Sequence, residues 1–134
     1  MKKFVLSLGF GFVVNNIVAT LVAAIILRPL LGQFWENTIR TDAQGLAFPS
    51  LLSGYFVLTL LMVVGYKYFS MQGSWLKKGV VWGLLIGGAT FLSGHLITAG
   101  WSIIPSLPMF ISGILDMLAP VATGVVISYV YRNE

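Results

Sequence analysis

Four long apolar segments separated by shorter polar stretches dominate the pattern of this chain, over about residues 4–27, 48–66, 79–99 and 107–131. A helix needs about 20 mostly apolar residues to cross a bilayer, and all four segments come close to that length. In lipid, helices satisfy their own backbone hydrogen bonds. The pattern therefore predicts an all-α integral membrane protein: a four-helix transmembrane bundle with short loops, forming a single domain over residues 1–134.

The first apolar segment resembles a secretory signal, because it begins with two lysines followed by an apolar run. Here the run is longer than the core of a signal, and Asn15 and Asn16 interrupt it. We therefore expect a retained helix, ended by the "RPL" at residues 28–30. The stretch "GQFWENTIR" (residues 32–40) follows, and it fits either a short helix on the outer membrane surface or an ordinary loop.

Composition supports the membrane interpretation. Hydrophobic residues make up 57% of the chain and charged residues 9%, and the mean hydropathy is +0.92. A water-soluble domain carries about a quarter charged residues, so the lipid bilayer is the expected surrounding. The absence of cysteine excludes disulfides and thiolate metal sites, and with one histidine we expect no metal and no cofactor.

The eight basic residues stand at the ends of the apolar runs instead of forming a patch, which argues against nucleic acid as a partner. Arg28 and Arg40 fall at one end of the predicted bundle. The other end carries Lys2, Lys3, Lys67, Lys77, Lys78 and Arg132. The positive-inside rule then predicts that both termini lie in the cytoplasm, and we expect the protein in a bacterial cytoplasmic membrane.

Asp116 is the most unusual residue of the fourth segment, since no other formal charge occurs between Gly79 and Tyr131. Helical spacing places it on a face of small and polar residues that would pack against other helices. Its neighbours on that face are Ser112, Gly113, Ala119, Pro120, Thr123 and Gly124. Pro120 has no N–H to bond the carbonyl of Asp116, which predicts a kink. An acidic residue among apolar helices is either a proton or cation site or a hydrogen-bonded tie between helices.

His95 lies on the third segment, one position beside a seam of small residues that favours close helix packing. That seam is formed by Gly83, Gly87, Thr90, Gly94 and Thr98. In a hairpin of segments three and four, a contact between His95 and Asp116 is offset by about one helical turn. His95 is therefore a hydrogen-bonded packing residue, a proton-transfer group or, least favoured because the chain has no second histidine, a metal or haem ligand.

Asn15 and Asn16 place two amides at the centre of the first segment. Asparagine in a membrane helix commonly bonds a neighbouring helix, contributing about 0.6 kcal/mol. We interpret the pair chiefly as a link between helices, with a pore or ligand contact as the alternative.

The stretches "RPLLGQFW" after the first segment and "KKGVVWGLLIGG" opening the third resemble small bacterial four-helix membrane proteins of families without an assigned function. That resemblance implies the fold and no activity. The chain lacks the cysteines of disulfide-linked quinone reductases. It also lacks a glutamate in the first helix like that of small multidrug transporters.

Three functions follow as hypotheses. The small-residue faces favour a helix-packing accessory subunit of a membrane complex, or a homo-oligomer. Asp116 and His95, with Asn15, Asn16, Thr90 and Ser112, favour a proton, ion or small-solute transporter. A lipid- or quinone-binding enzyme, using His95 with Trp35 and Glu36, is the least favoured, because the loops offer little mass for an active site.

Overall fold

The computed structural model describes residues 1–35 and 44–133, and the regular elements among these residues are helices, with no strand. Four helical segments are long and apolar enough to cross a membrane: Lys2–Phe34, Phe48–Tyr66, Trp75–Trp101 and Ser106–Val130. The number and type of the predicted elements are thus confirmed. Within these segments the elements are α1 (Lys2–Leu21), η1 (Val22–Leu27), α2 (Arg28–Leu31), η2 (Gly32–Phe34), α3 (Phe48–Tyr66), α4 (Trp75–Gly87), η4 (Gly88–Leu92), α5 (Ser93–Trp101), α6 (Ser106–Asp116) and α7 (Leu118–Val130).

The expected end of the first helix at residues 28–30 is wrong, because the helix continues through Pro29 to Phe34. A proline inside an α-helix removes one backbone bond and its ring crowds the preceding turn. Here the preceding turn is the π-helix η1. Its wider winding changes which backbone N–H and carbonyl groups are hydrogen-bonded just before the proline. The suggested surface helix over residues 32–40 falls mostly on residues 36–43, outside the described part of the chain, and Gly32–Phe34 form a 3₁₀ turn.

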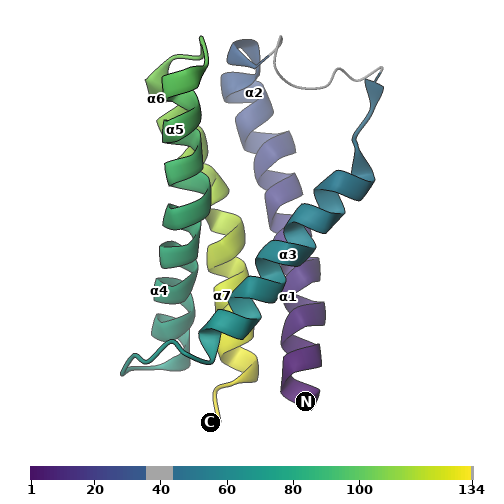
Figure 1. Cartoon of the computed structure of the whole chain (residues 1–134), viewed down its shortest axis with the longest axis vertical. Helices are drawn as coiled ribbons and strands as arrows, with labels where there is room; N and C mark the ends of the chain where they lie inside the picture. Colours follow the sequence, from purple (N-terminus) through teal and green to yellow (C-terminus); the bar gives the residue numbers. More distant parts are fainter. Residues whose placement is uncertain (36–43, 134) are drawn as a thin grey trace.

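The helix pair α6–α7 forms the centre of the bundle. Its second half, α7, packs against α4, α1 and α3, whereas α6 packs mainly against α5 and η4. Figure 1 shows α3 crossing the other helices obliquely and both chain ends lying at the same end of the molecule. That end carries the lysines of α1 and α4, and we call it the lysine end.

The best-buried apolar cluster lies near the lysine end. Met62 and Val63 of α3 and Ile127 of α7 are fully buried. Aromatic rings complete this region: Trp82 donates its indole N–H to the carbonyl of Met62 at 3.2 Å, and Tyr66 packs beside it. The core therefore joins α3, α4 and α7 at one end of the bundle.

Glycines let α4 approach α7 closely. Gly79, Gly83 and Gly87 are all buried on the side of α4 that faces α7. A Cβ added at Gly83 would lie 2.5 Å from the carbonyl oxygen of Pro120, so the two backbones nearly touch. This is the small-residue packing that allows membrane helices to associate without a hydrophobic driving force.

Candidate functional site

The side chains of His95 and Asp116 meet between α5 and α6. The distance from His95 Nε2 to Asp116 Oδ2 is 3.3 Å, and both side chains are about four-fifths buried, with 21% and 20% exposed. The other ring nitrogen, Nδ1, lies 2.7 Å from the carbonyl oxygen of Phe91. The contact that the sequence left open is therefore present.

This geometry determines how many protons the pair holds. A carbonyl oxygen can only accept, so Nδ1 of His95 must carry a hydrogen. The bond from Nε2 to the carboxyl group then needs one further proton, located on either partner. The pair is an imidazolium with a carboxylate, or a neutral imidazole with a carboxylic acid, and its net charge is zero in both cases.

The π-helix η4 explains why His95, and not Gly94, faces α6. A π-helix adds one residue to the turn, so the residues after it rotate relative to the helix before it. The contact face of Gly79, Gly83 and Gly87 accordingly continues to His95. Gly94 departs from the predicted packing seam: a Cβ added there would meet nothing within 4 Å.

An interruption of the fourth helix lies directly beside Asp116. The helix α6 ends at Asp116, Met117 forms a turn, and α7 begins at Leu118. Pro120 supplies no N–H to the carbonyl of Asp116, which is the reason that a kink was expected here, and the structure has a one-residue interruption at this point. Gly113, one turn before Asp116, lets α5 come close, since a Cβ at Gly113 would lie 3.3 Å from the Cβ of His95.

Two aromatic residues from other helices approach the pair. The ring of Trp35, at the end of the first helical segment, meets the His95 ring edge-on, with centroids 6.2 Å apart. Tyr55 of α3 lies within electrostatic range of the Asp116 carboxyl group. Sequence reasoning named Trp35 but missed Tyr55, whose signal is a tyrosine far from either end of an apolar helix. Glu36, the third member of the suggested shallow site, falls outside the described residues.

Ser112 and Thr90 differ in their relation to the pair. Ser112 is buried one turn before Asp116, and its hydroxyl has no hydrogen-bond partner within residues 1–35 and 44–133. Thr90 is exposed and donates its hydroxyl to the carbonyl of Ile86 on its own helix, at 2.7 Å. Ser112 therefore belongs to the neighbourhood of the pair, and Thr90 does not.

The two asparagines form hydrogen bonds with residues other than His95 and Asp116. Asn15 is fully buried and donates its side-chain N–H to Thr59 Oγ at 3.2 Å, so it links α1 to α3. Asn16 donates to the carbonyl of Phe12 on its own helix at 2.8 Å. Neither amide bonds to His95 or Asp116, and the expected link between helices is made by Asn15 alone.

The remaining predicted packing residues lie at helix contacts. Gly124 faces the backbone of α4 at Gly79 and Gly83. Pro120 packs against Gly87, where an added Cβ would lie 3.0 Å from the proline ring. These contacts hold α7 against α4 and leave the His95–Asp116 pair to join α5 to α6.

Comparison with family models, with curated proteins and with solved structures finds no match to this chain.

Proposed function

We propose that this chain is an integral membrane protein that moves protons across the bilayer by taking up and releasing a proton at the His95–Asp116 pair. The observation that carries the proposal is the contact between His95 Nε2 and Asp116 Oδ2 at 3.3 Å, which requires one proton between the two groups. Histidine and carboxyl groups exchange protons readily near neutral pH when their surroundings are suitable. Ionisable groups inside membrane helices commonly mark proton or ion pathways.

The depth of the pair supports this function. Asp116 lies ten residues from the start of α6, about 15 Å along the helix at the usual rise. That is half of a hydrocarbon core of about 30 Å. The site is also assembled by two irregular turns, η4 and Met117, and π-helical turns often occur at functional sites.

The orientation we propose has both termini in the cytoplasm of a bacterial cell. The termini share the lysine end of the bundle (Figure 1), and lysines concentrate on the cytoplasmic side of membrane proteins. In that orientation Asp116 lies near the middle of the membrane, and His95, six residues before the end of α5 at Trp101, lies in its outer half.

Proton movement can be measured in liposomes that contain the purified protein and a trapped pH-sensitive dye. After an external pH step, we expect wild-type protein to speed equilibration relative to protein-free liposomes. Asp116→Asn and His95→Gln should both remove this acceleration, because neither variant keeps the proton-sharing pair. Thr98→Val is the matched control, since within the described residues the Thr98 hydroxyl donates its bond to the carbonyl of Gly94 on its own helix.

Two results would contradict the proposal. One is a wild-type rate equal to that of protein-free liposomes. The other is Asp116→Asn protein that equilibrates as fast as wild type. Circular dichroism of each variant separates loss of the pair from loss of the fold.

A helix-packing role is the second candidate, and the face around Gly94 favours it. Gly94 is open, and Thr90 and Thr98 lie one turn away on either side with exposed side chains. Small residues spaced four apart are typical of contacts between membrane helices. The partner would be a second copy of this chain or another membrane protein.

Native mass spectrometry after gentle extraction from the native membrane tests this candidate. We expect a defined homo-oligomer or a stoichiometric complex, which Gly94→Leu should dissociate. Gly54→Leu is the matched control, because Gly54 is also open but lies on α3. A monomer with no associated protein would rule this candidate out.

A further inference from the structure

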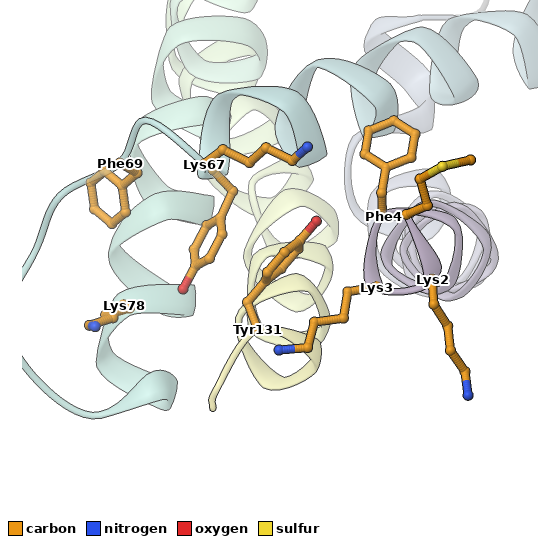
Figure 2. Close-up of a pocket in the computed structure, with 9 residues that line it drawn as sticks. Lys2, Lys3, Phe4, Lys67, Phe69, Lys78 and Tyr131 are labelled. Atoms are coloured by element: carbon orange, nitrogen blue, oxygen red, sulfur yellow. The ribbon is translucent and has the colours of Figure 1, made fainter. Parts of the chain in front are cut away.

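A pocket of about 600 Å³ opens at the lysine end of the bundle. It lies between the first turn of α1, the end of α3, the start of α4 and the turn after α7 (Figure 2). Its lining consists of Met1, Lys2, Lys3, Phe4, Tyr66, Lys67, Phe69, Lys78 and Tyr131. Four lysines, from the start of α1, the residue after α3 and the first turn of α4, thus line one space, and none of the described residues that line it is acidic.

Two of these lysines extend over the pocket. Figure 2 shows the Lys67 side chain reaching toward Phe4 and the Lys3 side chain reaching toward Tyr131, while Lys2 points away. The Lys67 ammonium lies 5.1 Å from the centre of the Phe4 ring, within cation–π range. Lys3 of α1 and Lys67, directly after α3, therefore bring positive charge to the pocket from two different parts of the chain.

The aromatic wall of the pocket is held in place by its own bonds. Ser128 donates its hydroxyl to the carbonyl of Trp75 at 2.6 Å. Because that uses its only hydrogen, the Tyr66 hydroxyl must donate to Ser128 Oγ, at 2.7 Å. The Tyr66 and Tyr131 rings lie 5.8 Å apart. The wall is thus rigid and largely apolar, and the lysines supply the positive charge for a ligand.

A second groove, of about 460 Å³, adjoins this pocket. It is lined by Met1, Phe4, Val5 and Lys67, three of which also line the first pocket. Apart from the Lys67 ammonium, these side chains are apolar. A cationic pocket that continues into an apolar groove matches a molecule with an anionic head and a hydrocarbon tail.

We propose that this pocket binds the phosphate headgroup of an anionic phospholipid, with an acyl chain lying along the groove beside Phe4 and Val5. Phosphate oxygens accept charge-assisted hydrogen bonds from lysine. Basic clusters at the cytoplasmic end of membrane helices recognise anionic lipids in this way. The groove favours a lipid over free phosphate, which has no tail to fill it. This proposal requires only that the chain lies in a membrane and does not depend on the His95–Asp116 pair.

Lipid binding can be measured by native mass spectrometry of full-length protein reconstituted in nanodiscs that contain equal amounts of phosphatidylcholine and phosphatidylglycerol. We expect phosphatidylglycerol to be retained preferentially after release. Each lysine near an anionic surface contributes a factor of about five in affinity. Lys3→Gln and Lys67→Gln should therefore each reduce the preference about fivefold, and Lys67→Arg should retain it.

Lys77→Gln is the matched control, because Lys77 lies at the same end of the bundle and outside the lining of the pocket. A parallel measurement adds inorganic phosphate as competitor and should leave the bound lipid in place. Three results would overturn the proposal: no preference in wild type, an equal loss in Lys77→Gln, or full displacement by inorganic phosphate. The first would show that the pocket does not select anionic lipid, the second would indicate a diffuse surface charge, and the third a site for free phosphate.

Discussion

Gly83 lies where α4 packs against α7, and its replacement by alanine tests how closely these helices approach. A Cβ at this position would lie 2.5 Å from the Pro120 carbonyl oxygen and 2.9 Å from its carbon. Ordinary contact begins at 3.4 Å, so the first distance is 0.9 Å too short. Since the opposing atoms belong to the backbone, no side-chain rotation relieves the clash, and the helices must separate.

The size of the effect follows from two opposing contributions. Overpacking a tight contact costs about 1–3 kcal/mol. Alanine favours the helix over glycine by about 1 kcal/mol. Gly54→Ala is the matched control, because Gly54 is helical and an added Cβ meets nothing within 4 Å. Both variants gain the helix preference, so the difference between their unfolding free energies isolates the steric cost.

Unfolding in mixed micelles by increasing amounts of sodium dodecyl sulfate, followed by circular dichroism, provides these free energies. We expect Gly54→Ala to equal or exceed wild type in stability. Gly83→Ala should be less stable than Gly54→Ala by about 1–3 kcal/mol. Equal stability of the two variants would refute the close approach of α4 and α7.

Two further predictions concern polar links between helices, and the same unfolding experiment measures both. Thr59→Val removes the acceptor for the buried Asn15 amide and should destabilise the fold by about 0.6–1.7 kcal/mol; no loss would mean that Asn15 finds another partner. Tyr66→Phe removes the bond to Ser128 and leaves the Ser128–Trp75 bond intact, so we expect a loss of about 1 kcal/mol, and a larger loss would show that the ring itself has moved.

The sequence was sufficient for the helices and for the end of the molecule that carries the lysines. Each apolar run of membrane length predicts one helix from local composition alone, so the number and type of the elements could be predicted. Pro29 is the instructive exception. The rule for an ordinary α-helix predicts that the helix ends there, whereas the structure continues the helix past Pro29 after a π-helical turn.

The residue types of the site could be predicted from the sequence, but the alignment of His95 with Asp116 across the two helices could not. Asp116 and His95 stand out as the ionisable groups of their segments, but an ideal helix offsets them by about one turn. The extra residue in η4 brings His95 onto the contact face and moves Gly94 off it. No single residue in Gly88–Leu92 signals a π-helix, so this rotation could not be read from the pattern.

The two irregular turns lie against each other, and this gives the bundle two parts. A Cβ at Gly87, the last residue before η4, would lie 3.0 Å from the Met117 side chain at the break between α6 and α7. On one side of this level, α4 and α7 are held by closely packed glycines. On the other side, α5 and α6 are joined by the His95–Asp116 bond and the contact at Gly113. A change in the protonation of that pair would therefore act directly on the contact between α5 and α6. These two helices are separated from α4 and α7 by the irregular turns η4 and Met117.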